Sequence, residues 1–201
     1  MSKSVLYMSM SLDGFITGPD DDVGQGLGSG GERLHDWLGD GGDGDGVDGY
    51  RPSGPSGEIF DELMATGAVL VGRRTFDIAG RWDGDHHSVP IFIPTRGTPP
   101  EPASEWVHYV TDGVESAMSQ AKRAAGDANV LVHGAGVAQS CLRAGVLDEL
   151  EVHLIPVLLG AGRPLFGDLA EHVELELTRV VDAPGVTHLR FRVKAEVFGP
   201  A

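Results

Sequence analysis

The segment from residue 129 to residue 138 constrains the fold more than any other part of the chain. An apolar run with the pattern of a buried strand (130–132) leads through His133 into the turn Gly134-Ala135-Gly136 and then into a helical pattern. Glycine has no side chain, so Gly134 and Gly136 let the backbone approach a bulky anion. The N–H groups and the positive end of the helix dipole face that anion. The segment therefore predicts a phosphate site between a strand and a helix.

A second candidate anion site lies upstream, where the apolar run 69–71 ends at Gly72-Arg73-Arg74-Thr75. Each site has a simpler interpretation, because glycine often only marks a turn and an arginine pair is often only solvated charge. Two such sites in one chain favour a dinucleotide. A plain Rossmann fold is not indicated, since the third small residue of its fingerprint is replaced by Gln139.

Charge restricts the partners. The chain has 30 acidic and 15 basic residues and a formal net charge of -15, so its field repels a nucleic-acid backbone. We expect no nucleic-acid partner. Against this background Arg73, Arg74 and Arg96 stand out, and we expect them to converge on an anionic ligand because the guanidinium fork matches phosphate oxygens.

Length and composition favour one domain over residues 1–201, since 201 residues of which 41% are hydrophobic can bury one core. The apolar runs are too short to cross a bilayer, and the N-terminal residues lack a signal-peptide pattern. We therefore expect a cytoplasmic protein without a membrane partner. The single cysteine, Cys141, excludes an intramolecular disulfide and is expected to be buried and inert.

Apolar strand patterns alternate with helical ones through residue 145. The segments 5–10, 68–71, 89–93 and 130–132 are apolar on both faces, as in central strands. Helical spacing occurs in 59–64, ending at Gly67, in 114–125, opened by a capping box of Asp112 and Glu115, and in 137–142, closed by Gly145. The pattern predicts a three-layer α/β/α fold around a mainly parallel mixed sheet.

The last fifty residues change character. Apolar and polar residues alternate around 150–154, 173–177 and 189–193, which predicts antiparallel strands with one solvent-exposed face. The turn 182–185 (DAPG) predicts a C-terminal hairpin. The apolar run 154–159 fits either the core or the interface of a homodimer.

Glycine and aspartate crowd the region 24–57, most densely in a loop at about 39–57, with a short helical piece at 32–38. Such segments are typical of lids, binding loops or disorder. Asp43, Asp45 and Asp48 could bind calcium, but an EF-hand-like loop would have Val47 at a ligand position and lacks its closing glutamate. We predict no metal site there, and we interpret His86-His87 as surface residues.

Six short motifs occur in an order that resembles the dihydrofolate-reductase-like family, and in particular its branch containing the reductase domain of riboflavin biosynthesis. They are SMSLDGFI (9–16), VLVGRRTF (69–76), GAG (134–136), GVLDEL (145–150), PVLLGAG (156–162) and PLF (164–166). The resemblance covers nearly the whole chain. It implies a mixed sheet that binds NADPH in an extended pose along the carboxyl edge of its strands.

The resemblance also implies which residues contact the cofactor. Gly72, Arg73, Arg74 and Thr75, with Thr95 and Arg96 after the next strand, would hold the adenosine phosphates. The turn of Gly134, Ala135, Gly136 and Val137 would receive the diphosphate, although Ala135 departs from the double glycine usual in the family.

The proton donor stays open between three carboxylates. The helix 32–38 offers Glu32 or Asp36, neither an unambiguous equivalent of the dihydrofolate-reductase carboxylate, and the turn 11–14 offers Asp13, which fits a plain turn aspartate equally well. Trp37 is either a stacking platform for a flat heterocycle or a core residue.

These features predict an NADPH-dependent reductase of a pterin, a pyrimidine or a related carbonyl or imine compound. One alternative is a reductase-fold protein that binds a nucleotide-like ligand without catalysis. Another is a metal-dependent hydrolase or calcium module organised by the Asp-Gly loop. The chain lacks the His-x-Glu and paired-cysteine motif of the deaminase that is fused to some riboflavin reductases.

Overall fold

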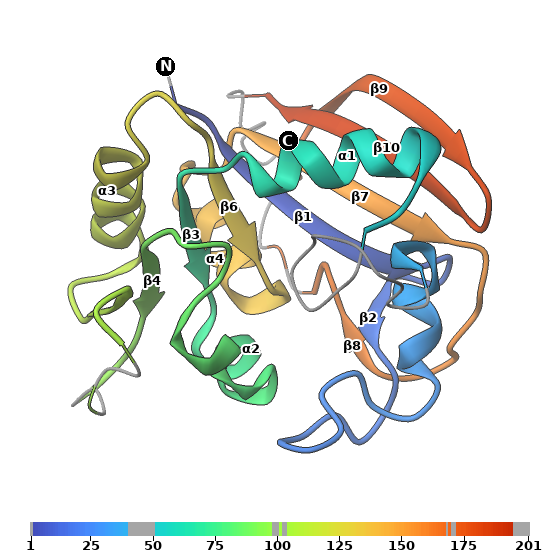
Figure 1. The fold of residues 1–201 in the computed structure, drawn as a ribbon, viewed down its shortest axis with the longest axis horizontal. Helices are drawn as coiled ribbons and strands as arrows, with labels where there is room; N and C mark the ends of the chain where they lie inside the picture. Colours follow the sequence, from blue (N-terminus) through green and yellow to red (C-terminus); the bar gives the residue numbers. More distant parts are fainter. Residues whose placement is uncertain are drawn as a thin grey trace.

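The computed structural model describes residues 2–39, 51–97, 101, 104–167, 169 and 172–194. An eight-stranded mixed sheet forms its centre, in the order β5-β4-β3-β6-β1-β7-β10-β9 (Figure 1). The strands are β1 (Ser4–Ser11), β3 (Ala68–Val71), β4 (Ile91–Pro94), β5 (Val107–Val110), β6 (Val130–His133), β7 (Glu149–Ile155), β9 (Leu175–Ala183) and β10 (Val186–Val193). A separate two-stranded sheet pairs β2 (Phe15–Thr17) with β8 (Arg163–Pro164).

The six strands from β5 to β7 are parallel, and β10 and β9 complete the sheet as an antiparallel hairpin. The hairpin turns at Pro184-Gly185, where Gly185 has a φ of 76° that suits glycine. The mainly parallel sheet and the C-terminal hairpin predicted from the sequence are both confirmed.

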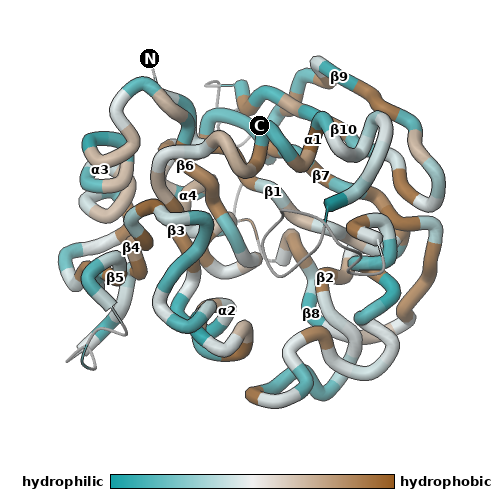
Figure 2. The backbone as a smooth tube through the Cα atoms, in the orientation of Figure 1, coloured by the Kyte–Doolittle hydropathy of each residue, from teal (hydrophilic) through white to brown (hydrophobic). Residues whose placement is uncertain are grey.

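Helices cover both faces of the sheet and give three layers (Figure 1). The helices α3 (Val114–Ala125) and α4 (Ala135–Arg143) pack on the face that carries Leu6 and Leu70. On the opposite face, Val5 and Val69 belong to the core that α2 (Arg73–Ile78) enters through Phe76. Alternate residues of each strand thus point to two cores, and the hydrophobic segments in Figure 2 coincide with these strands.

The prediction for β7 was right in one part, since the strand pairs antiparallel with β10, but its expected solvent-exposed face was wrong. The strand is parallel to β1, and its polar residues Glu151 and His153 are 0% and 2% exposed rather than solvated. It lies between β1 and β10, where α1 (Gly54–Met64) crosses the sheet (Figure 1). Arg179 and Arg190 bind the Glu151 carboxylate at 2.9 and 3.3 Å, so the buried charge is compensated by ion pairs that periodicity cannot reveal.

Two boundary predictions were also wrong. Helix α3 has Gly113 as its N-cap without a side-chain cap, because Asp112 accepts a hydrogen bond from Ser116 Oγ instead of capping the helix. Residues 54–57, assigned to the loop 39–57, form the first turn of α1, where a proline near the N-terminus supports the helix. Strand β4 begins at Ile91, two residues later than expected.

The remaining expectations divide between confirmed and undescribed residues. The helical piece at 32–38 exists as the 3-10 helix η1 (Gly31–Leu38). Cys141 is fully buried, and burial raises the pKa of its thiol to about 12, as expected for an inert cysteine. Asp43, Asp45 and Asp48 lie outside the described residues. None of the described helices combines the length and apolar character needed to cross a membrane.

Candidate active site

A cavity of about 800 Å³ lies where β3, β4 and β6 end, and we call it the arginine cavity. Its lining includes nine of the ten residues predicted to contact the cofactor. They are Gly72, Arg73, Arg74, Thr75, Thr95, Arg96, Ala135, Gly136 and Val137. The tenth, Gly134, lies directly behind this surface. The carboxyl edge of parallel strands is where open α/β sheets bind ligands.

The two glycines of the turn have different tasks. Gly134 has a φ of 101°, and a Cβ on it would collide with the Thr75 hydroxyl, so glycine lets the turn pack against α2. Gly136 has no heavy atom within 4 Å of the position a Cβ would take. Its open surface faces the cavity at the N-terminal end of α4, a nine-residue helix whose first N–H groups have no partner within the helix.

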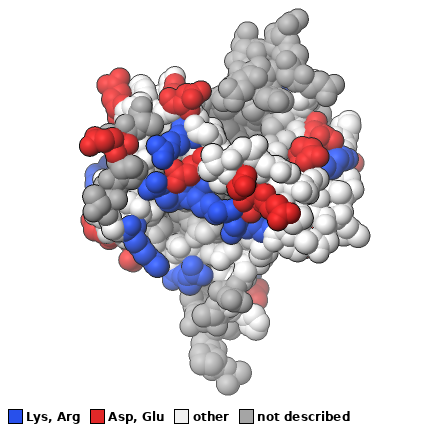
Figure 3. Space-filling view, turned by 90° about the horizontal axis from the view of Figure 1, so that it is seen from below, with Lys and Arg blue, Asp and Glu red and all other residues white. Residues whose placement is uncertain are grey.

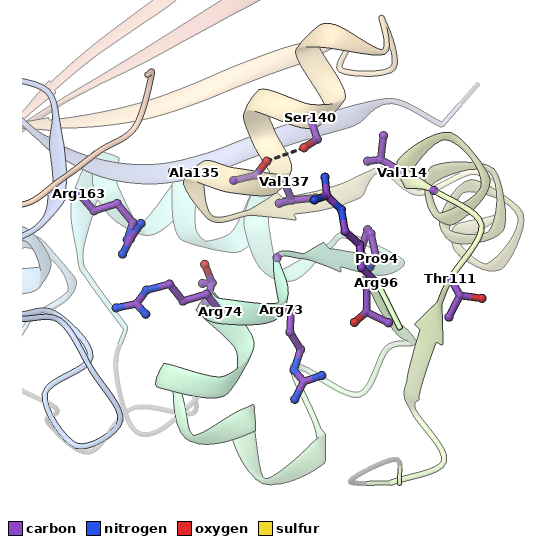
Figure 4. A pocket seen from close by; sticks show the side chains of 15 residues that line it. Arg73, Arg74, Pro94, Arg96, Thr111, Val114, Ala135, Val137, Ser140 and Arg163 are labelled. Atoms are coloured by element: carbon purple, nitrogen blue, oxygen red, sulfur yellow. Dashed lines mark hydrogen bonds between the residues drawn. The ribbon is translucent and has the colours of Figure 1, made fainter. Parts of the chain in front are cut away.

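Four arginines line this cavity, but the expected convergence of Arg73, Arg74 and Arg96 is not found. Arg74 and Arg163 point toward each other at one end, whereas Arg73 points away and Arg96 extends toward Val137 (Figure 4). Figure 3, which views the molecule from below, shows basic side chains gathered in a band across the surface, with acidic side chains beside it.

The four arginines also differ in the ion pairs that they make. Asp21 binds both Arg74 and Arg163 at 3.1 Å. Burial raises the pKa of the Asp21 carboxyl, but the hydrogen bonds from these two arginines outweigh it and the net shift is downward. Arg73 binds Asp77 at 2.6 Å and stacks over the ring of Tyr109. Arg96 makes no ion pair within the part of the chain that the structure describes.

A second cavity, of about 630 Å³, opens on the α1 side of the sheet, and we call it the histidine cavity. Its lining mixes aromatic side chains, four histidines and two carboxylates. The lining includes Tyr7, Met8, Glu32, His35, Asp36, Trp37, Trp82, His86, His133 and His153. The sequence analysis did not predict this cavity, because its residues come from seven segments with no shared motif.

The buried histidines of this cavity are neutral at pH 7. Burial lowers the pKa of His133 to about 4 and that of His86 to about 3, and it lowers the pKa of His153 well below its usual value. His133 Nδ1 lies 3.1 Å from the Tyr7 carbonyl oxygen, which can only accept, so Nδ1 carries the proton. The interpretation of His86-His87 as surface was wrong, because His86 packs against Trp82 in the cavity wall.

Trp37 is both a core residue and part of the cavity wall. Its side chain donates a hydrogen bond from Nε1 to Ser9 Oγ at 2.9 Å and packs on His153 with 4.6 Å between ring centroids. His153 is fixed in turn by a 2.9 Å contact between its Nδ1 and His188 Nδ1. Its Nε2 has no hydrogen-bond partner among the described residues. The wall is therefore rigid and aromatic.

The structure separates the three predicted carboxylates. Glu32 and Asp36 both line the histidine cavity. Asp13 lines neither described cavity: its carboxylate accepts hydrogen bonds from Ser11 Oγ at 2.5 Å and from the Leu159 and Gly160 N–H groups at 3.1 and 2.7 Å. The Ser11 hydrogen bond lowers its pKa most. Asp13 thus joins two loops.

Sequence reasoning missed Arg163, which follows the glycine-rich run 160–162 directly. An arginine directly after a glycine was the available signal, and Arg73 likewise follows Gly72. The histidines left no comparable signal, because His133 is a single residue at the end of an apolar strand and His153 is one of the alternating polar residues of β7.

The two cavities are neighbours. His133 lines the histidine cavity and Ala135 lines the arginine cavity, so only Gly134 separates them along the chain. Gly134 N–H lies 3.3 Å from the sulfur of Met8, which belongs to the histidine cavity. A ligand extended along the ends of the strands can therefore enter both.

Comparison with known proteins identifies the class of this chain. Residues 3–189 match the family model of the RibD C-terminal domain, so the chain belongs to that family. The Bacillus subtilis protein YwjB, described as uncharacterized, is 27% identical over 184 residues, which cover 87% of this chain and 88% of YwjB.

Solved structures agree on the fold. A protein from Shewanella sp. PV-4 described as a putative riboflavin biosynthesis protein superposes with a TM-score of 0.71 at 21% identity, covering 96% of this chain and 99% of that protein. A Thermotoga maritima diaminohydroxyphosphoribosylaminopyrimidine deaminase/5-amino-6-(5-phosphoribosylamino)uracil reductase gives a TM-score of 0.62 at 14% identity, covering 96% of this chain and 57% of that one. The reductase-type fold implied by the sequence motifs is thereby confirmed.

Proposed function

We propose that this protein is an NADPH-dependent reductase that transfers a hydride to a planar heterocyclic carbonyl or imine compound. The observation that carries the proposal is the pair of adjacent cavities, one lined by four arginines and a helix N-terminus, the other by aromatic rings and two carboxylates. Dinucleotide phosphates match the first cavity in charge, and a flat acceptor matches the second in shape.

The arginine cavity fits the cofactor. Its volume of about 800 Å³ is in the range of cofactor pockets, and Gly136 leaves its backbone open to a diphosphate. Arg74, Arg163 and the first turn of α4 would hold the diphosphate. Arg96 and Thr95, at the end of β4, would hold the adenosine phosphate. The nicotinamide end would then lie beside Met8 and His133.

Bound NADPH supplies the hydride, and the acceptor also needs a proton on its nitrogen or oxygen. Glu32 is the better proton donor of the two carboxylates in the histidine cavity. The Asp36 carboxylate is already engaged by Arg33 at 2.9 Å, whereas Glu32 makes no ion pair among the described residues. Trp37 and Trp82 would exclude water and orient the flat ring of the acceptor.

The test is the oxidation of NADPH, followed by its absorbance, with pterin and pyrimidine acceptors. Steady oxidation that depends on the acceptor is the expected result, together with NADPH binding in calorimetry. The second candidate function, binding of a nucleotide-like ligand without catalysis, predicts NADPH binding with no turnover for any acceptor. Absence of NADPH binding contradicts both.

A further inference from the structure

The histidine cavity has a charge pattern that restricts the acceptor more than its shape does. Its carboxylates, Glu32 and Asp36, are the only charged side chains in its lining among the described residues, and no lysine or arginine lines it. The lining therefore offers a phosphate group two carboxylates, one of them paired with Arg33, and no lysine or arginine.

The arginines next to the lining residues do not change this balance. Arg33 is bound to Asp36 at 2.9 Å, and Arg81, which precedes Trp82, is bound to Asp77 at 3.1 Å. Arg190 stacks over the ring of Tyr7, but it is bound to Glu149 at 2.8 Å and to Glu151 at 3.3 Å. Histidine does not supply a cation either, because burial lowers the pKa of all four histidines in the lining: His35, His86, His133 and His153. The adjoining arginine cavity, in contrast, is lined by four arginines, and one of them, Arg96, makes no ion pair among the described residues.

We infer that the acceptor of this protein is an unphosphorylated planar heterocycle, neutral or cationic, and that a phosphorylated form of the same ring is rejected from the histidine cavity. The inference rests on the proposed function, since it concerns the acceptor site of that reaction. Under this inference the two ligands are recognised by different groups. Phosphate groups are recognised only on the cofactor side, and the acceptor is recognised by its ring.

Two features favour a ring as the recognised group. Trp37 and Trp82 supply aromatic surface. His133 has its Nδ1 proton committed to the Tyr7 carbonyl, so its Nε2 is a hydrogen-bond acceptor suited to a ring N–H group. Carboxylates accept hydrogen bonds from ring amino groups in the same way, whereas they repel a phosphate dianion.

The test compares matched ligand pairs by calorimetry at low salt: uridine with uridine 5′-monophosphate, and neopterin with neopterin monophosphate. Each titration uses protein saturated with NADP⁺, which blocks the arginine cavity and cannot donate a hydride. We expect the unphosphorylated member of at least one pair to bind at least tenfold more tightly. The preference should shrink in higher salt, where charge repulsion is screened.

Substitutions of the two carboxylates test whether they cause the preference for the unphosphorylated ligand. Glu32→Gln combined with Asp36→Asn should reduce the preference to less than threefold, since it removes both carboxylates and frees Arg33 from its ion pair. Glu58→Gln is the matched control, because Glu58 is exposed on α1, outside the lining, and its loss should leave the preference unchanged.

Equal or tighter binding of the phosphorylated members, or no binding of any member, overturns the inference. Failure of the proposed function has a different signature: NADP⁺ does not bind, or no acceptor is reduced. If NADP⁺ does not bind, the same titrations are run with excess inorganic pyrophosphate, and the preference for unphosphorylated rings is judged independently.

Discussion

The arginine cavity and the histidine cavity are separated along the chain by one residue, yet the charged side chains that line them have opposite sign. The first is lined by four arginines and no carboxylate, and the second by two carboxylates and neutral histidines, among the residues that the structure describes. The lining of the first comes mainly from turns and a helix end. The lining of the second comes mainly from side chains of β1, β6, β7, η1 and α1 and of the segment 82–86.

This difference teaches how one sheet edge can hold two unlike ligands. Backbone N–H groups and arginines recognise phosphate wherever it occurs, so under the proposed function charge would direct a dinucleotide to the arginine cavity. A cavity of opposite character beside it cannot compete for those phosphates. The predictions below test this separation, from the largest expected effect to the smallest.

The largest effect is expected from Glu32→Gln. The change removes the proposed proton donor of the histidine cavity but preserves its size, and general acid catalysis typically contributes 10²–10⁴-fold. We expect kcat to fall about 10³-fold with an unchanged Kd for NADPH, measured by steady-state kinetics and calorimetry. Asp36→Asn is the matched control and should cost less than tenfold. Equal losses in the two variants would show that the cavity uses its carboxylates only as charges.

The next effect concerns the backbone of the arginine cavity. Gly136→Val places a branched side chain where the diphosphate would lie, so affinity for NADPH should fall about 100-fold, or about 2.7 kcal/mol. The melting temperature should change little, since a Cβ at Gly136 meets no atom within 4 Å.

Gly134→Val is the matched control for this prediction. Its side chain would collide with Thr75 at a φ of 101°, so this variant should lose stability before any ligand is added. Calorimetry with NADPH and thermal unfolding of both variants distinguish the two tasks. A Gly136→Val protein that is unstable but still binds NADPH would contradict the assignment.

The two cavities were unequally predictable from the sequence. The arginine cavity follows from local motifs, because a strand, a glycine turn and a helix are consecutive in the chain and the sheet brings their ends together. Nine of its lining residues were named in advance. Arg163 was not, since its position depends on β8 pairing with β2, a long-range contact between two very short strands.

The histidine cavity could not be assembled from the sequence. His133 and His153 occupy single strand positions, and only the order of β6, β1 and β7 in the sheet brings them near each other. The polar residues of β7 gave a misleading signal because their environment is also set by long-range contacts. Alternation predicts that the face of β7 with Glu151 and His153 is solvated, but α1 and the hairpin arginines cover that face. Helix α1 itself was anticipated, although its contact with that face was not.

The third effect is a pH dependence of stability in the histidine cavity. His133 has a pKa of about 4 in the folded protein against an ordinary value of 6.5, so the unfolded chain binds its proton first as pH falls. Its contribution to stability is full above pH 6.5 and is lost progressively between pH 6.5 and pH 4.

From these two pKa values, lowering the pH from 7 to 5 should cost about 2 kcal/mol of unfolding free energy through His133 alone. In His133→Gln, urea unfolding at the two pH values should show a correspondingly smaller difference. The exposed residue His172 provides the control, since His172→Gln should leave the difference unchanged. An identical pH dependence in His133→Gln and the unmodified protein would show that His133 is not the group responsible.

The smallest effect concerns cofactor preference within the arginine cavity. We expect NADPH to bind about tenfold more tightly than NADH, a difference of about 1.4 kcal/mol that one charge-assisted phosphate contact supplies. Arg96 is the best candidate for that contact, because Arg73 is bound to Asp77 at 2.6 Å and stacked on Tyr109. An arginine already paired with a carboxylate gains less from a phosphate than one without an ion pair.

Arg96→Ala should therefore bring the Kd values of NADPH and NADH to within about threefold of each other, mainly by weakening NADPH. Arg73→Ala, with the same loss of charge in the same cavity, should retain most of the preference. Calorimetry with both cofactors at moderate salt measures the two ratios. If Arg73→Ala abolishes the preference and Arg96→Ala does not, the phosphate displaces Asp77 from Arg73, and the adenosine end lies against α2 rather than at the end of β4.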